Sequence, residues 1–384
     1  EIGYDKLLLA TGSEPIVPPL PGLDLDGVFT VNNLHKAIEI KDRIAKGRVG
    51  KAVIVGGGAI GIEMAEAFKD LWGVDATIVE MKSHLLPSLV DWEMADILAR
   101  HLRDSGLEVL LEEAAQEILS DGEGRVRGVR TDKREIAGDM VIIAVGVRPR
   151  SILAQEAGLH VSRGGAIVVT ERMQTSDPDI YAAGDCVEIT HLVSGQKFFA
   201  PLGSLANKQG RVAGDNICGV PSVFKGGVGS FIMKGFDMSI GAAGLTLQGA
   251  REAGFDADIS LTSPIDRAHF YPTQAVTCFL MVFDRRTRRV LGLQGIGPMG
   301  DGILARINGA APLLCEGGAR VFAGMLAAGL IDEEFVTWCP VFVGRDPENF
   351  RPGYSEGVAW TPENAPYSEP ISVHRAGDYL YMRT

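Results

Sequence analysis

The chain has 384 residues, of which 46% are hydrophobic and 48 are glycine, and its formal net charge is −12. This length is too great for a single hydrophobic core, so it predicts two or three domains of a globular α/β protein. The acidic balance, with an isoelectric point near 5.1, leaves no basic patch with which to bind nucleic acid or an anionic membrane.

The first predicted element is a short strand at 7–10, which ends in Thr11 and Gly12 and is followed by prolines at positions 15, 18, 19 and 21. Proline fixes φ and lacks an N–H group, so regular structure cannot continue through this stretch. We therefore expect the exit strand of a domain whose beginning is not present, followed by a crossover segment. A helix is predicted over 34–45.

Residues 52–80 predict a dinucleotide-binding unit of strand, glycine turn, helix and second strand. Gly56 permits the tight turn, Gly58 lets backbone N–H groups approach a pyrophosphate, and Gly61 lets the helix pack closely. The helix N-terminus adds unpaired donors and a partial positive charge. The competing interpretation is a glycine-rich packing turn. The nucleotide contacts that we expect are Gly56, Gly58, Ala59, Ile60, Gly61, Glu80 and Met81.

Glu80 closes the second strand, where a carboxylate can accept hydrogen bonds from both hydroxyls of an adenine ribose. A carboxylate repels the 2′-phosphate of NADP, so NAD(H) is the preferred nucleotide. Lys82 could attract a phosphate, although a solvated loop lysine is the more ordinary interpretation of that residue.

Further along the chain, Asp91 is expected to cap a helix that runs through Ser105, followed by a strand at 107–111 and a β-meander at 115–136. The apolar strand at 141–147 then ends in a glycine turn and Pro149, as the first strand did. Two such strands suggest the two crossings into and out of an inserted domain, or else two unrelated strand ends.

The remaining chain predicts a strand that ends in Gly184 and Asp185, and a helix that begins near Pro201. From Gly229 the pattern changes to an α+β domain. Its expected strands and helices lie at 230–232, 275–283 and 290–296 and at 246–253 and 319–328. The last 36 or so residues are rich in Pro, Gly and Glu and are expected to be irregular.

The five cysteines are widely spaced and form no CxxC pair, which argues against a disulfide framework or a metal site. Most of them are expected to be small buried hydrophobes, and Cys339, between Trp338 and Pro340, is a candidate working thiol. No apolar run approaches the roughly 20 residues that span a bilayer, and no signal peptide is recognisable. We therefore expect a cytoplasmic protein.

Several motifs, in order, resemble those of the FAD-dependent pyridine nucleotide-disulfide oxidoreductases. The most similar branch contains coenzyme A-disulfide reductase, NADH oxidase, NADH peroxidase and persulfide reductase. The resemblance covers residues 4–349. The motifs are LLLATGSEP and VGVRP for the two crossovers, GGGAIGIE for the NADH fingerprint, DIYAAGD and PLGSLANKQGRVAG for the flavin contacts, and AHFYPTQ with GRDPEN for the C-terminal interface domain.

The resemblance implies an α/β fold in which a Rossmann-like NAD-binding domain is inserted in an incomplete FAD-binding domain, followed by an α+β dimerisation domain. The implied segments are 1–30 and 149–225 for the FAD domain, 31–148 for the NADH domain, 226–348 for the interface domain and 349–384 for an irregular tail. The implied cofactors are FAD and NADH, a small-molecule substrate is the other partner, and the chain would be a homodimer.

The resemblance also assigns roles to single residues. Asp185 would hydrogen-bond the flavin ribityl chain, although it could instead be a helix cap. The helix at Leu202 and Gly203 would stabilise negative charge on the reduced ring. Glu63, near the nicotinamide, and Tyr271, which would reach the partner subunit or else lie in a core, are the catalytic candidates. The other implied cofactor contacts are Thr11, Gly12, Gly146 and Gly184.

Three departures separate this sequence from the family pattern. The N-terminal segment with the flavin fingerprint and the redox cysteine is missing, Ala59 replaces an aromatic gate, and residues 338–343 lack the expected tyrosine. Residues 303–318 also look like an insertion. Two functions stay open: an NADH-dependent flavoprotein oxidoreductase represented by part of its chain, and a flavin-free NAD(H)-binding or dimerisation module.

Overall fold

The computed structural model describes residues 2–266, 274–298 and 300–308 and three further strands within the last 50 residues. The chain divides into two compact units, Glu1–Gly300 and Asp301–Thr384.

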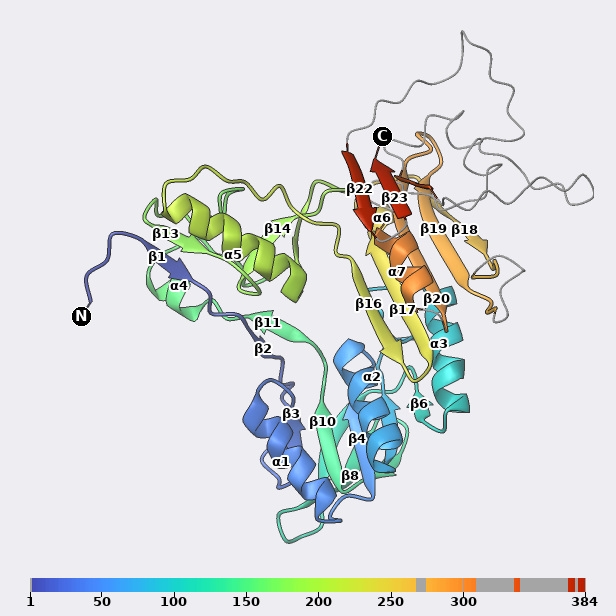
Figure 1. Cartoon of the computed structure of the whole chain (residues 1–384). Coiled ribbons are helices and arrows are strands. Elements are labelled where there is room, and N and C mark those ends of the chain that lie inside the picture. The colour runs from blue at the N-terminus through green and yellow to red at the C-terminus, as the bar shows by residue number, and fades with distance from the viewer. Residues whose placement is uncertain are drawn as a thin grey trace, which may run out of the picture. The chain divides into compact units, whose positions relative to one another are not determined.

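A five-stranded parallel sheet forms the centre of the segment 28–143 (Figure 1). Its strand order is β3-β10-β4-β5-β6, and every neighbouring pair is parallel. The strands are β3 (Val28–Thr30), β10 (Met140–Ile143), β4 (Lys51–Val55), β5 (Asp75–Val79) and β6 (Glu108–Leu110). All four residues of β10 are buried, as expected of a parallel strand that is covered on both faces.

Side chains alternate between the two faces of this sheet. Ile54, Ile78 and Ile142 belong to a core shared with three helices, whereas Val53 and Val141 pack on an antiparallel meander. The helices are α1 (Leu34–Ala45), α2 (Ala59–Glu66, continued by a π-helical turn Ala67–Leu71) and α3 (Trp92–Asp104). The meander strands are β7 (Ala115–Ser120), β8 (Val126–Thr131) and β9 (Glu135–Ala137). These elements confirm the helices, strands and meander predicted in this part of the chain.

The central sheet is an insertion in a second domain. Strand β1 (Leu7–Leu9), which precedes the sheet in sequence, pairs in parallel with β13 (Ile180–Ala182), which follows it. Strands β2 (Ser13–Pro15) and β11 (Val147–Pro149) form an antiparallel pair between the two domains. Glu14 holds this pair by an ion pair of 2.8 Å with Arg148. The prediction of two crossings side by side is therefore confirmed.

The second domain has its own core, to which β1, β13 and the other elements between residues 152 and 217 contribute. These elements are α4 (Ile152–Glu156), a three-stranded sheet of β12 (Ile167–Val168), β14 (Val187–Thr190) and β15 (Lys197–Phe199), and helix α5 (Gly203–Ile217). Helix α5 contacts β13 and confirms the helix expected near Pro201.

A five-stranded antiparallel sheet follows, with strand order β16-β17-β20-β19-β18. Its elements are β16 (Phe231–Gly235), β17 (Met238–Gly244), α6 (Leu247–Glu252), β18 (Ala257–Thr262), β19 (Cys278–Asp284) and β20 (Val290–Gly297), with α7 (Gly300–Asn308) next in sequence. The sequence predicted β16, β19, β20 and α6 but missed β17 and β18. Strand β17 was missed because its glycine and alanine run SIGAAG shows no alternation of polar and apolar residues.

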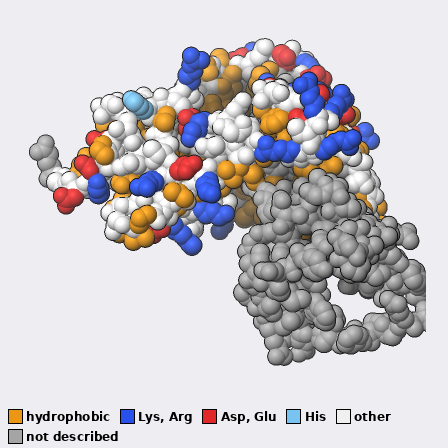
Figure 2. Space-filling view, turned by 90° about the horizontal axis from the view of Figure 1, so that it is seen from above, with side chains coloured by type: hydrophobic (Ala, Val, Ile, Leu, Met, Phe, Trp, Pro, Cys, Tyr) orange, Lys and Arg blue, Asp and Glu red, His pale blue; other side chains and the backbone are white. Residues whose placement is uncertain are grey.

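The arginine-rich turn between β19 and β20 is paired with acidic residues. Arg285 lies 2.9 Å from Asp258 and Arg286 lies 3.2 Å from Asp256. Figure 2 shows Lys and Arg side chains at the surface together with Asp and Glu side chains. The two salt bridges neutralise part of the positive charge of this turn.

Asp91 lies at the N-cap position of α3, as predicted, but its side chain does not cap that helix. The carboxylate instead accepts hydrogen bonds from the backbone N–H of Leu247, at 2.9 Å, and from the amide of Gln294, at 2.6 Å. The side-chain capping of α3 predicted from the sequence is therefore wrong. Asp91 caps α6 and links the nucleotide domain to the antiparallel sheet.

The described part of the second unit contains an antiparallel sheet in the order β21-β23-β22. Its strands are β21 (Phe335–Trp338), β22 (Ser372–Ala376) and β23 (Tyr379–Arg383). Strands β22 and β23 fall in the segment expected to be irregular, so that expectation is wrong for these residues. The helix predicted at 319–328 lies outside the described residues.

Candidate functional site

Close contacts with backbone atoms explain why two positions in and after the turn that follows β4 are glycine. Gly56 has φ +114°, and a Cβ atom there would lie 2.3 Å from the carbonyl oxygen of Ala144, at the end of β10. A Cβ atom at Gly61 would lie 2.0 Å from the carbonyl oxygen of Gly56. The turn can therefore lie against Ala144 only because Gly56 lacks a side chain, and α2 can lie against the turn only because Gly61 does. A Cβ at Gly58 would meet only open space, which leaves room for a ligand to approach the backbone.

The first turn of α2 offers hydrogen-bond donors. Its N-cap, Gly58, has no side chain to cap the helix, and the N–H groups of Ala59, Ile60 and Gly61 have no partner along the helix. The helix dipole places partial positive charge at the same point. This end of α2 can hold an anionic group such as a pyrophosphate.

Glu80 follows β5 beside this turn and is 7% exposed. One carboxylate oxygen accepts the N–H of Gly57 at 2.7 Å, and the other accepts the N–H of Lys82 at 2.8 Å. The sequence did not predict these two bonds, because they depend on the fold of the turn. Each oxygen keeps a second lone pair for a ribose hydroxyl. Glu80 therefore holds the turn, and the ribose contact predicted for it stays a prediction.

Three other predicted residues surround this turn. Glu63 lies exposed on α2, and Met81 is 64% exposed. The side chain of Lys82 is exposed and forms no ion pair with any residue that the structure describes. These positions agree with a solvent-accessible nucleotide site, and the roles predicted for Glu63 and Met81 stay predictions.

A second cluster forms where β1 and β13 end and α5 begins. Asp185 accepts a hydrogen bond from the hydroxyl of Ser13, at 3.1 Å, and the N–H of Gly184 donates to the side-chain oxygen of Gln209, at 2.7 Å. Gly184 has φ +87°. Gly12, at the end of β1, accepts from the N–H of Arg150 at 2.9 Å. Residues from three distant stretches of sequence thus meet at Asp185.

The start of α5 belongs to the same cluster. Its N-cap, Leu202, supplies no side-chain hydrogen bond, and its carbonyl accepts the N–H of Leu205 at 3.0 Å, so the N–H groups of Gly203 and Ser204 are the ones without a partner along the helix. A Cβ built on Gly184 would lie 3.7 Å from the Cβ of Ala206, and one built on Gly203 would meet no atom within 4 Å. The cluster thus combines a carboxylate, open space over glycines and a positive helix end. These features suit a ligand with hydroxyl groups and a ring that gains negative charge on reduction, as FAD has.

Gly146 and Thr11 lie at the two crossings. Gly146 has φ +110° and accepts the N–H of Ile16 at 2.9 Å. Thr11 donates its hydroxyl hydrogen bond to the carbonyl of Arg150. Both residues therefore help to hold the crossings together, a contact that the sequence did not predict.

Two candidates, Tyr271 and Cys339, lie outside the described residues. Of the cysteines that the structure describes, Cys186 is buried, Cys278 is half-buried and Cys218 is exposed. The thiol of Cys186 lies 3.3 Å from the carbonyl oxygen of Ala183. Cys186 is therefore a structural residue beneath the Gly184–Asp185 turn, as expected of a small buried hydrophobe. Among the described residues no group of three or more His, Cys, Asp or Glu side chains could hold a metal ion.

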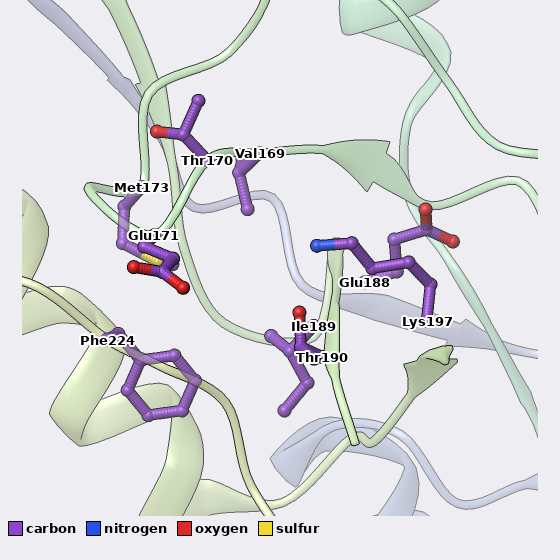
Figure 3. A pocket seen from close by; sticks show the side chains of 9 residues that line it. All are labelled: Val169, Thr170, Glu171, Met173, Glu188, Ile189, Thr190, Lys197 and Phe224. Carbon is purple, nitrogen blue, oxygen red and sulfur yellow. The ribbon is translucent and has the colours of Figure 1, made fainter. Parts of the chain in front are cut away.

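A shallow pocket lies beside β14 and β15 (Figure 3). It is lined by Val169, Thr170, Glu171, Met173, Glu188, Ile189, Thr190, Lys197 and Phe224. None of the predicted site residues is among them, so the pocket is separate from both clusters.

The fold and these clusters define a protein with a nucleotide-binding domain inserted in a second cofactor-binding domain. Family comparison agrees: residues 1–200 match the pyridine nucleotide-disulphide oxidoreductase family, and residues 232–321 match its dimerisation domain. The chain belongs to the pyridine nucleotide-disulphide oxidoreductase family, whose cofactors are FAD and NADH.

Two curated relatives illustrate the similarity. An NADH oxidase of Methanocaldococcus jannaschii is 37% identical over 347 residues, which cover 90% of this chain and 74% of the relative. An NAD(P)H coenzyme A polysulfide/persulfide reductase of Pyrococcus horikoshii is 38% identical over 314 residues, which cover 82% and 69%.

Solved structures give the same result. An FAD-dependent pyridine nucleotide-disulphide oxidoreductase from Desulfovibrio vulgaris is 42% identical with a TM-score of 0.72, covering 85% of this chain and 76% of that one. An NAD-dependent persulfide reductase from A. fulgidus is 39% identical with a TM-score of 0.78, covering 81% and 57%. A water-forming NADH oxidase from Lactobacillus brevis, bound to NADH, is 29% identical with a TM-score of 0.74, covering 81% and 67%.

A second family match lies at the C-terminal end. Residues 303–364 match the RibD C-terminal domain, and this match begins where the sequence suggested an insertion. The motif AHFYPTQ falls within the dimerisation match, whereas GRDPEN falls beyond it and within the RibD match. The assignment of GRDPEN to the interface domain is therefore unsupported.

Proposed function

We propose that this protein takes part in NADH-dependent flavoprotein oxidoreduction and passes the electrons to a disulfide, a persulfide, a peroxide or dioxygen. One observation carries the proposal. The same chain holds a glycine turn with Glu80 and a second cluster at Asp185 and α5, and the two domains are joined by the paired crossings. A module that bound only NAD(H) would have no use for the second cluster. Relatives named NADH oxidase and persulfide reductase support the same conclusion.

In this proposal some residues of the chain bind NADH and FAD, and others stabilise the charge that develops on the flavin ring. The N–H groups at the start of α2 bind the pyrophosphate of NADH, and Glu80 accepts from its ribose. Asp185 accepts from the ribityl hydroxyls of FAD, with Ser13 holding its carboxylate. Bound FAD supplies the ring that takes up hydride from NADH. The positive end of α5 stabilises negative charge at that ring, and Glu63 lies beside the nicotinamide.

An anaerobic titration tests the proposal. NADH added to the protein with bound FAD should abolish the visible flavin absorbance, because two electrons enter the ring. Persistence of the flavin absorbance would contradict the proposal. NADH binding without any FAD binding or turnover would instead support a flavin-free NAD(H)-binding module.

We further propose a cytoplasmic homodimer in which Tyr271 reaches the site of the partner subunit, and we retain the domain boundaries given above as predictions. The match of residues 232–321 to a dimerisation domain supports the assembly. Among the described residues no helix is long and apolar enough to cross a membrane. Sedimentation equilibrium should give twice the mass of the chain, and a monomeric mass at micromolar concentration would exclude the homodimer.

A further inference from the structure

The Gly184–Asp185 turn depends on a residue to which the sequence assigned no role. Gln209 lies on α5 and is 2% exposed. Its side-chain oxygen accepts the N–H of Gly184 at 2.7 Å. The N–H of the preceding residue, Ala183, pairs instead with the carbonyl of Leu9 at 3.1 Å. The strand pairing with β1 thus ends at Ala183, and α5 supplies the next partner.

This hydrogen bond lies at the residue immediately before Asp185. Gly184 adopts φ +87°, so the chain turns sharply immediately before the carboxylate. The peptide N–H at the turn is held by α5 on one side, and the Asp185 carboxylate is held by Ser13 on the other. Since the same helix provides the unpaired N–H groups at Gly203, the Gln209 bond sets the distance between the carboxylate and the positive helix end.

We propose that Gln209 is a positioning residue of the flavin site. Its oxygen keeps Asp185 and the start of α5 in the arrangement that binds the ribityl chain and the ring of FAD. This inference rests on the proposed function. The proposed role depends on one atom of Gln209, the side-chain oxygen that accepts the N–H of Gly184.

The substitution Gln209→Met tests the inference, because methionine has a similar volume and cannot replace the amide as an acceptor. FAD should bind about tenfold more weakly, as expected from the loss of one well-placed hydrogen bond. The NADH dissociation constant should stay unchanged, because the glycine turn at α2 is separate. Hydrogen exchange at the Gly184 and Asp185 amides should become faster. Lys208→Met, an exposed neighbour on the same helix, is the matched control and should behave like the wild type.

The outcomes distinguish the two proposals. If the wild type binds no FAD, the proposed function fails and the role of Gln209 fails with it. If the wild type binds FAD and Gln209→Met binds it equally well, only the role of Gln209 is overturned. A parallel loss of FAD and NADH affinity would show a general structural role and would also overturn it. If the variant does not fold, hydrogen exchange of the wild type is compared with and without FAD. Bound FAD should slow the exchange of the Gly184 and Asp185 amides, and unchanged exchange rates would refute the inference.

Discussion

At the scale of single residues, two carboxylates of the nucleotide domain act through backbone N–H groups. Glu80 accepts from Gly57 and Lys82, and Asp91 accepts from Leu247. Such charge-assisted bonds fix the position of a turn or a helix end more strongly than neutral bonds do. The residue types at these positions could be predicted from the sequence, whereas the partners of Asp91 and Gln209 could not, because they lie far away along the chain.

Glu80→Ala should weaken NADH binding by about 1–3 kcal/mol, because it removes a charged acceptor of the ribose and releases the N–H of Gly57. Isothermal titration with NADH measures the change. Glu123→Ala, which removes an exposed carboxylate from the meander, should leave the dissociation constant unchanged. An unchanged constant for Glu80→Ala would refute the ribose assignment.

His191 should make the stability depend on pH. Burial lowers the pKa of its imidazole below the usual 6.5, although a backbone hydrogen bond at Gly244 opposes this shift. The unfolded chain then binds a proton at a higher pH than the folded protein does, so this contribution to stability is complete above about pH 6.5 and is lost as the pH falls toward the folded-state pKa.

Urea unfolding of the wild type and of His191→Phe, measured between about pH 7.5 and pH 5, tests this linkage. The wild type should lose more unfolding free energy on acidification than the variant. Phenylalanine keeps an aromatic ring beside Phe198, whose ring centroid lies 4.8 Å from that of His191. Equal pH dependence in the two proteins would count against the assignment to His191.

At the scale of elements, the strand, turn and helix of the nucleotide unit depend on where a Cβ atom is tolerated. Gly61 faces the carbonyl of Gly56, whereas Gly58 faces open space. The two glycines should therefore respond differently to the same substitution.

Gly61→Ala should destabilise the protein by about 1–3 kcal/mol and abolish tight NADH binding, because the added methyl forces α2 away from the turn. Gly58→Ala should leave the unfolding free energy nearly unchanged and weaken NADH binding, because its methyl occupies ligand space. Thermal unfolding and NADH titration of both variants measure the contrast. Similar unfolding temperatures for the two variants would show that the close approach at Gly61 is unimportant.

The nucleotide unit was predictable because both β4 and β5 are short, largely apolar strands, KAVIV and DATIV, and the glycine spacing between them is regular. Helix α1 was predicted with the bounds that the structure shows. Strand β17 was missed because small residues form strands only when neighbouring strands, here β16 and β20, provide the pairing.

At the scale of the first unit, the nucleotide domain and the antiparallel sheet share one hydrophobic core. A Cβ at Gly235 of β16 would lie 3.3 Å from side-chain atoms of Leu98 and Leu102 of α3. Asp91 and the buried Gln294 add a reciprocal pair of hydrogen bonds across this boundary. The two domains should therefore unfold together.

Asp91→Ala should lower the unfolding free energy by about 1–3 kcal/mol, because the amide of buried Gln294 and the N–H of Leu247 lose their acceptor. Denaturant unfolding followed by circular dichroism measures the loss. Asp96→Ala, which removes a partly exposed carboxylate paired with Arg100 on the same helix, should change the stability by less than about 0.5 kcal/mol. Equal effects of the two variants would show that the link across the boundary adds nothing.

The sequence by itself determined the nucleotide unit, the crossings and the family, because local periodicity, glycine spacing and motif order are properties of contiguous residues. The tertiary structure alone decided that Asp91 caps a helix of another domain, that Gln209 accepts from the Gly184–Asp185 turn, and that Glu80 fixes the glycine turn. These contacts join residues that are distant in sequence, and only the packing of the folded chain selects which donor each acceptor meets.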